Sequence, residues 1–233
     1  MNGSFQSLFV DNVSRQHYQA DPATTEKSHV QVVIWPTFSG LTQFEKDIAD
    51  QIAAFGYSAT ALDLYGTNTP ESMEDKRSIM GVLLSEEAPL HDLQRSLVEA
   101  ACPNASSKTI VHVGFCLGGR LSLEAGLHLT GSAGAVSFHG LMSFYRGAKE
   151  DVNRDVKIMV LNGYDDHLVS DENSQSAKHY WTELGIDFQF MDFGNTMHSF
   201  MLPSANNPDH GSMYNPTVAK RGYHYLEHFL SEF

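Results

Sequence analysis

The chain has 233 residues, of which 42% are hydrophobic and 18% charged, and its formal net charge is -13. This length and composition predict one globular domain over residues 1–233, with enough hydrophobic residues for its own core. Phosphate backbones and anionic lipid surfaces repel such an acidic chain. We therefore expect neither nucleic acid nor a membrane as its partner.

The two cysteines and the N-terminal segment predict a cytoplasmic protein. Cys102 and Cys116 are too few for a disulfide framework. No run of about 18 apolar residues is present, as a membrane-spanning helix would need. Residues 1–13 contain neither the basic nor the apolar segment of a signal peptide. A reducing compartment, in which both thiols stay free, is the expectation that follows.

The first clear elements lie between residues 30 and 64. The β-branched run VQVVIW predicts a buried strand over 30–35 that ends before Pro36. Apolar residues at helical spacing predict a helix over 43–55, and a second strand is expected over 58–64. Residues 67–89 have weak periodicity and predict only short helices.

The same alternation continues to the end of the chain. Further strands are predicted over 108–113, 133–138, 156–161 and 187–193. Further helices are predicted over 91–101, 117–129, 174–184 and 216–229, the last beginning at Pro216. Alternating strands and helices form βαβ units, so we predict an α/β fold with a mostly parallel sheet and helices on both faces.

Ligands of such sheets bind where the strands end at their carboxyl side. One of these ends, Gly114-Phe115-Cys116-Leu117-Gly118-Gly119, has the G-x-nucleophile-x-G pattern of a strained strand-to-helix turn, with cysteine as the nucleophile. Glycine is needed there because a Cβ at either flanking position would clash. A helix N-terminus also favours the thiolate form of Cys116. An inert buried cysteine in a glycine-rich turn is the alternative interpretation.

Two further strand ends supply the partners of such a nucleophile. Asp165 and Asp166 follow the strand 156–161, and His198 follows the strand 187–193. The chain order nucleophile, acid, histidine is that of hydrolases with this turn. We assign His198 as the base and Asp166 as its carboxylate partner, and we interpret Asp165 as a turn residue.

Other site classes find little support in the sequence. The remaining histidines form no compelling metal-ligand spacing with a carboxylate, so we expect no metal. The segment 114–119 lacks the Lys-Ser/Thr ending of a phosphate-binding loop, which makes a nucleotide site improbable. We expect no cofactor. His112 lies in mid-strand and is interpreted as structural.

These segments together resemble the dienelactone hydrolase family. The similarity rests on residues 54–57 and 63–66, the turn 114–119, residues 163–169, His198-Ser199-Phe200 and residues 214–216. It implies an α/β-hydrolase fold and a Cys116–His198–Asp166 triad. The resemblance also implies an oxyanion hole formed by the backbone N–H groups of Leu117 and Phe38.

The resemblance has two departures that concern the substrate. Thr37 stands where members that hydrolyse dienelactone carry a glutamate, and Leu202 stands where they carry an anion-binding arginine. Arg77 is a candidate for a second arginine. We therefore expect a less cationic pocket, with residues from the predicted strand ends lining it. These candidates are Trp35, Thr37, Phe115, His139 and Phe200.

The function that follows is the hydrolysis of a small carboxylic ester or lactone. Two alternatives remain open at this point. One is a catalytically silent ligand-binding module on the same fold. The other is a redox or thiol-sensing protein that uses Cys116 without turnover. The oligomeric state has no signal in the sequence.

Overall fold

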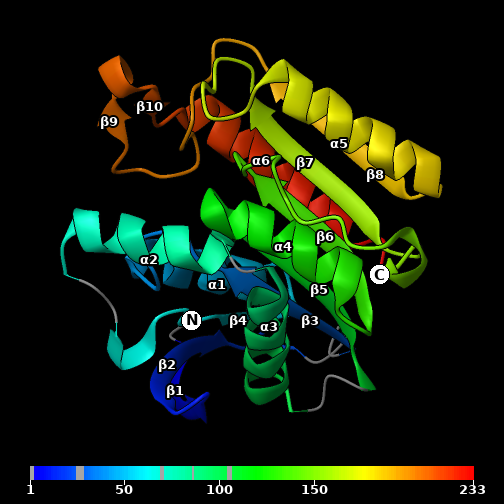
Figure 1. Cartoon of the computed structure of the whole chain (residues 1–233). Coiled ribbons are helices and arrows are strands. Elements are labelled where there is room, and N and C mark those ends of the chain that lie inside the picture. Colours follow the sequence, from blue (N-terminus) through cyan, green and yellow to red (C-terminus); the bar gives the residue numbers. More distant parts are fainter. Residues whose placement is uncertain (1–2, 25–28, 69–70, 86, 104–106) are drawn as a thin grey trace.

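A computed structural model describes residues 3–24, 29–68, 71–85, 87–103 and 107–233. Its centre is an eight-stranded sheet in the order β1-β2-β4-β3-β5-β6-β7-β8 (Figure 1). The strands are β1 (Ser4–Val10), β2 (Val13–Ala20), β3 (Val30–Trp35), β4 (Ser58–Ala61), β5 (Thr109–Phe115), β6 (Ser132–Phe138), β7 (Lys157–Gly163) and β8 (Asp187–Phe193). All pairs from β4 to β8 are parallel, which confirms the predicted α/β class.

Helices cover both faces of this sheet (Figure 1). They are α1 (Gln43–Ala54), α2 (Met73–Ser85), α3 (Glu87–Ala101), α4 (Leu117–His128), α5 (Asp171–Leu184) and α6 (Pro216–Leu230), with short 3-10 turns at Gly66–Asn68, Lys149–Asp151 and Pro208–His210. The hydrophobic residues of α1 and α6 pack into one core cluster. A second core cluster contains hydrophobic residues of α3 and α4. A third contains hydrophobic residues of α4 and α5. None of the helices in the described ranges combines the length and apolar character that a membrane crossing requires.

Local sequence signals account for several helix ends. Thr42 and Glu45 form a reciprocal capping box at the start of α1. Ser170 caps α5, which therefore begins three residues before the predicted Ser174. Asn215 caps α6, and Pro216 occupies its first turn as predicted.

Two parts of the architecture differ from the sequence-based expectation. Strands β1 and β2 form an antiparallel hairpin that adds to the sheet beside β4, and neither was predicted. Asp11 and Asn12 turn this hairpin with positive φ angles of 51° and 61°. The region 67–89 forms one long helix, α2, and the beginning of α3, whereas only short helices were expected.

A small two-stranded ribbon lies beyond the carboxyl end of β8. It consists of β9 (Asn206–Asn207) and β10 (Ser212–Met213), and it was not predicted either. The backbone N–H of His198 donates to the Gly211 carbonyl over 3.0 Å, and Met213 N–H donates to the His198 carbonyl over 3.0 Å. This ribbon therefore holds the backbone of a predicted site residue.

Candidate active site

Cys116 lies in the tight turn between β5 and α4. Its φ is 57° and its ψ is -118°, a backbone conformation that only strong surrounding constraints impose on a residue with a side chain. Its N–H donates to the Phe138 carbonyl at the end of β6 over 3.1 Å. Its side chain is partly exposed. The turn thus presents the thiol at the N-terminus of α4, outside the carboxyl end of β5.

The flanking glycines are required by close backbone contacts. A Cβ on Gly114 would lie 1.8 Å from the Gly118 carbonyl oxygen. A Cβ on Gly118 would lie 2.1 Å from the carbonyl oxygen of Trp35 and 2.6 Å from that of Pro36. A side chain at Gly114 would push Gly118 away from the end of β5. A side chain at Gly118 would push the start of α4 away from the end of β3. The geometry is that of the nucleophile-bearing turn inferred from the sequence.

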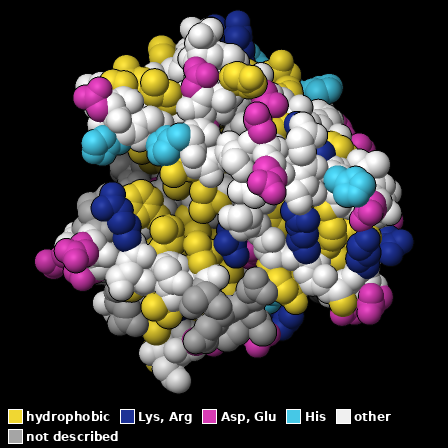
Figure 2. Space-filling view, turned by 45° about the horizontal axis from the view of Figure 1, so that its top comes forward, with side chains coloured by type: hydrophobic (Ala, Val, Ile, Leu, Met, Phe, Trp, Pro, Cys, Tyr) yellow, Lys and Arg dark blue, Asp and Glu magenta, His cyan; other side chains and the backbone are white. Residues whose placement is uncertain are grey.

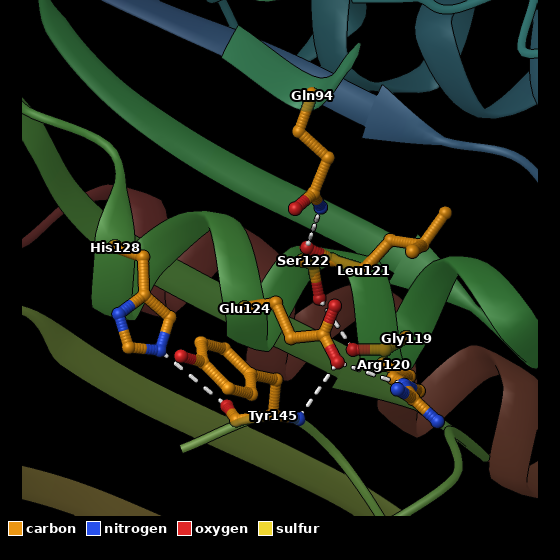
Figure 3. A network of polar contacts seen from close by, with 8 residues as sticks. All are labelled: Gln94, Gly119, Arg120, Leu121, Ser122, Glu124, His128 and Tyr145. Carbon is orange, nitrogen blue, oxygen red and sulfur yellow. Dashed lines mark hydrogen bonds and ion pairs between the residues drawn. The ribbon is translucent and has the colours of Figure 1, made fainter. Parts of the chain in front are cut away.

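A network of polar contacts anchors α4 along its length (Figure 3). Glu124 has a fully buried side chain, and its Oε1 accepts from Arg120 Nε over 2.8 Å and from the Tyr145 N–H over 2.8 Å. Gln94 of α3 donates to the Leu121 carbonyl over 2.9 Å. Because burial of a charge is costly unless it is paired, these contacts favour one position for α4 and hence for Cys116.

His198 and Asp166 lie together at the ends of β8 and β7. His198 Nδ1 and Asp166 Oδ2 are 2.7 Å apart, and both residues are buried. Asp166 Oδ1 accepts the Leu168 N–H over 3.0 Å, which fixes the carboxylate. Asp165 is exposed to solvent, and its one hydrogen bond within the described residues runs from its N–H to the Thr196 carbonyl. Of the two adjacent aspartates, Asp166 is the one that contacts the histidine.

The Cys116 side chain affects the pKa of His198. Burial alone would lower the pKa of His198, but the hydrogen bond to Asp166 and the interaction with the Cys116 side chain outweigh it and raise this pKa to about 10. Nε2 of His198 has no hydrogen-bond partner within the described residues. The ring therefore bonds to Asp166 through Nδ1, and its Nε2 is unpaired.

His139 packs against the same imidazole from the end of β6. Its ring meets that of His198 edge to face, with centroids 5.0 Å apart. It has no exposed surface and a strained φ of 38°. Burial, together with the positive charge of His198, lowers the pKa of His139 well below its usual range. His139 is therefore a neutral neighbour of His198.

The loop after β3 lies against the start of α4. In this loop the Thr37 carbonyl accepts the Gly40 N–H over 2.9 Å, which closes a tight turn around Phe38 and Ser39. Neither the Phe38 N–H nor the Leu117 N–H donates to another group in the described part of the chain. Both predicted donors are therefore unpaired in the described part of the chain.

The predicted lining residues divide into two groups. The side chains of Trp35, Phe115 and Phe200 have no exposed surface and belong to the core beneath the site, where the Trp35 indole donates to His112. Thr37 and His139 are buried just beyond the ends of β3 and β6, and His139 packs on His198. Figure 2 shows a hollow with a largely hydrophobic floor between the region of β9 and β10 and that of α2.

Sequence reasoning missed three side chains that hold the loop after β3. Glu45 of α1 accepts from Thr37, Tyr65 donates to the Phe38 carbonyl, and Lys76 of α2 donates to the Ser39 carbonyl. The capping-box spacing from Thr42 to Glu45 was a visible signal for the first of them. Thr37 stands where the resemblance places a glutamate, and its N–H and hydroxyl both donate to the Glu45 carboxylate.

Comparisons with known proteins agree with this arrangement. An uncharacterised protein of Caenorhabditis elegans is 32% identical over 121 residues, which are 51% of this chain and 77% of that protein. A Synechocystis protein named “Putative carboxymethylenebutenolidase” is 28% identical over 138 residues, 55% of each chain. The structure of a dienelactone hydrolase-like promiscuous phosphotriesterase from metagenomic libraries is 21% identical with a TM-score of 0.86, covering 100% of this chain and 99% of that one. This likeness shows an α/β-hydrolase fold.

The family model matches nearly the whole of the chain. The model described as “Dienelactone hydrolase family” covers residues 16–233, from β2 to the C-terminal residue. The matched range includes the strained turn at Cys116, the Asp166–His198 pair and the loop after β3. This chain therefore belongs to the dienelactone hydrolase family of α/β-hydrolases.

Proposed function

We propose that the chain hydrolyses a small carboxylic ester or lactone through a triad of Cys116, His198 and Asp166. The observation that carries this proposal is the pairing of His198 with Asp166 over 2.7 Å after β8 and β7, together with the strained turn that places Cys116 after β5. A nucleophile, a base and a group that orients the base are the three parts that covalent hydrolysis needs.

The first half of the reaction forms an S-acyl cysteine. The proton shared by the Cys116–His198 pair lies on Nε2 of His198 at the start of the reaction. Sγ of Cys116 bonds to the carbonyl carbon, and the carbonyl electron pair moves to its oxygen. The tetrahedral intermediate then breaks its bond to the leaving oxygen. The proton on Nε2 passes to that oxygen and gives an alcohol, which stays tethered when the substrate is a lactone.

The second half returns the enzyme. His198 takes a proton from a water molecule as the water oxygen bonds to the thioester carbon. Collapse of this intermediate breaks the C–S bond and leaves the proton on Nε2 beside the Cys116 sulfur, which restores the starting pair. The carboxylic acid leaves. Asp166 holds the Nδ1 tautomer and stabilises the imidazolium in both halves.

The free N–H groups of Phe38 and Leu117 are assigned as the oxyanion hole. Both tetrahedral intermediates place a negative charge on the former carbonyl oxygen. Backbone donors that are already oriented toward this charge cost no reorganisation during the reaction, and each is worth about 2.7–4 kcal/mol when removed. Their lack of a partner within the described residues supports this assignment.

The substrate class follows from the charges beside the site. Leu202 is partly buried against the hydrophobic core, Thr37 is neutral, and Arg77 is exposed to solvent. The hydrophobic floor of the hollow in Figure 2 suits an apolar acyl or alcohol group. The family name, and the name of the Synechocystis relative, support including lactones among the substrates.

A substrate panel tests the proposal directly. We would measure turnover of p-nitrophenyl esters, thioesters and unsaturated lactones by the wild-type chain and by Cys116→Ala, with Cys102→Ala as the matched control. Hydrolysis that is lost in Cys116→Ala and retained in Cys102→Ala is the expected result. Substrate binding without turnover would instead identify a silent binding module.

A further inference from the structure

The loop Thr37–Gly40 is held by side chains from three separate elements. Glu45 comes from α1, Tyr65 follows β4, and Lys76 comes from α2. Each contacts a different one of three consecutive loop residues. Loops at strand ends are usually the more mobile parts of a fold, so this density of side-chain contacts on three residues requires an explanation.

Glu45 is the most completely bonded of the three. Its Oε1 accepts from the N–H and from Oγ1 of Thr37, both over 3.1 Å. Its Oε2 accepts from the N–H of Thr42 over 2.8 Å and from Thr42 Oγ1 over 2.5 Å. The residue has no exposed surface. A carboxylate with four donors in a buried site fixes the groups that bind it.

Tyr65 fixes the other side of Phe38. Its hydroxyl donates to the Phe38 carbonyl over 3.0 Å. Its ring lies against Gly40, where a Cβ would be 3.0 Å from the ring carbon Cδ2. Cys116 contributes to the raised pKa of Tyr65, after the larger effect of burial, so Tyr65 lies near the nucleophile as well as the loop.

These contacts determine where the Phe38 N–H points. The N–H belongs to the peptide between Thr37 and Phe38, whose carbonyl is turned toward the Gly40 N–H. All described peptide bonds are trans, so the Phe38 N–H points away from that turn. Glu45 holds the atoms just before this peptide and Tyr65 holds those just after it. The peptide has little freedom to rotate.

We propose that Glu45 and Tyr65 are positioning residues that hold the Phe38 N–H in the orientation needed to bind the oxyanion. The inference rests on the proposed function, because it presupposes an oxyanion at this loop. Misplacement of an oxyanion donor reduces the rate of the chemical step more than substrate binding, since the charge exists only in the intermediate and the transition states around it.

The test uses Tyr65→Phe and Glu45→Gln, with Tyr18→Phe as the matched control. Tyr18, like Tyr65, is a buried tyrosine with a hydrogen-bonded hydroxyl. Its hydroxyl donates to the Asp50 carboxylate, and it lies in β2. We expect kcat for a p-nitrophenyl ester to fall by about 10- to 100-fold in Tyr65→Phe, less than the roughly 10²–10³-fold loss on removing a donor. KM should change little. Glu45→Gln should show the same pattern, and Tyr18→Phe should leave both constants unchanged.

Two further measurements separate this role from others. Alkylation of Cys116 by iodoacetamide forms no oxyanion, so its rate should be unchanged in Tyr65→Phe. Amide exchange at Thr37 and Gly40 should become faster in that variant and not in Tyr18→Phe. Unchanged exchange, unchanged kcat, or equal losses in alkylation and hydrolysis would each overturn the proposal. Failure of the proposed function has a different signature, because hydrolysis would then continue in Cys116→Ala. That result would overturn the role of Glu45 and Tyr65 as well.

Discussion

Asp165 and Asp166 are neighbours in the chain with opposite surroundings. Asp166 is buried against His198, and Asp165 faces solvent. We predict that Asp166→Asn lowers kcat severely, by up to about 10⁴-fold, because an amide no longer selects the correct histidine tautomer. Asp165→Asn is the matched control and should have a small effect. Steady-state kinetics of both variants would check this, and equal losses would contradict the assignment.

The charge state of His198 gives a prediction about stability and pH. Its pKa of about 10 in the folded chain lies above the ordinary value of about 6.5 in the unfolded chain. The stabilising contribution of the charged ring is therefore complete below about pH 6.5 and is lost as the pH rises through about 10. Asp166 supplies part of this contribution.

Urea unfolding of the wild-type chain and Asp166→Asn at several pH values would measure it. The difference in free energy of unfolding between them should be larger near pH 6 than near pH 10.5. A difference that does not change with pH would mean that His198 is neutral throughout this range.

Some residues of the candidate site could be predicted from the sequence and others could not. Cys116, Asp166 and His198 could be selected because each follows a predicted strand and the three occur in a known chain order. The roles of Glu45 and Tyr65 depend on how α1 and the segment after β4 fold back onto the loop after β3. The capping-box spacing relates Glu45 to Thr42, but no local pattern in the sequence describes its contact with Thr37 or that of Tyr65 with Phe38.

Among the elements, the turn between β5 and α4 is the one on which the site depends most. Gly118 packs directly on the backbone of Trp35 and Pro36, just before the loop that carries Phe38. We predict that Gly118→Ala loses most of the hydrolytic activity, because a Cβ 2.1 Å from a backbone oxygen must displace the turn or the loop.

Gly81→Ala in α2 is the control for this change, since nothing lies within 4 Å of its Cβ position. Alanine there should leave activity intact and add up to about 1 kcal/mol to stability. Activity would be measured per folded protein, with folding checked by circular dichroism. Wild-type activity and stability in Gly118→Ala would contradict this interpretation of the turn.

The strands that the sequence predicted well have a clear residue pattern. Strand β3, VQVVIW, has six buried residues, five of them hydrophobic. Strand β8, DFQFMDF, alternates polar and hydrophobic residues over most of its length. The hairpin β1–β2 is half exposed, and its polar residues, such as those of VSRQHYQA, hide the strand pattern. The ribbon β9–β10 is too short to produce a pattern at all. Both are visible only once their pairing partners are known.

At the scale of the whole molecule, charge bears on the choice of substrate. The chain carries 28 acidic and 15 basic residues, and Leu202 stands where the family resemblance places an anion-binding arginine. A missing charge-assisted contact is worth roughly 1.5–3 kcal/mol. We predict that neutral short-chain esters or lactones have a higher kcat/KM than carboxylate-bearing dienelactones.

Ionic strength provides the control for this prediction. Added salt screens the repulsion between the acidic protein and an anionic substrate, so kcat/KM for the anionic lactone should rise with salt. The value for a neutral ester should stay constant. A clear preference for the anionic lactone would contradict the prediction, and Lys76→Met would then show whether Lys76 binds its carboxylate.

The central claim is that Cys116 forms a covalent bond to the acyl group of the substrate. The most direct measurement is mass spectrometry of the chain quenched in acid during turnover of p-nitrophenyl acetate, followed by peptide mapping. We predict one acetyl group on the peptide that contains Cys116, absent in Cys116→Ala and unaffected by Cys102→Ala. An acetyl group at another residue, or turnover that continues in Cys116→Ala, would contradict it.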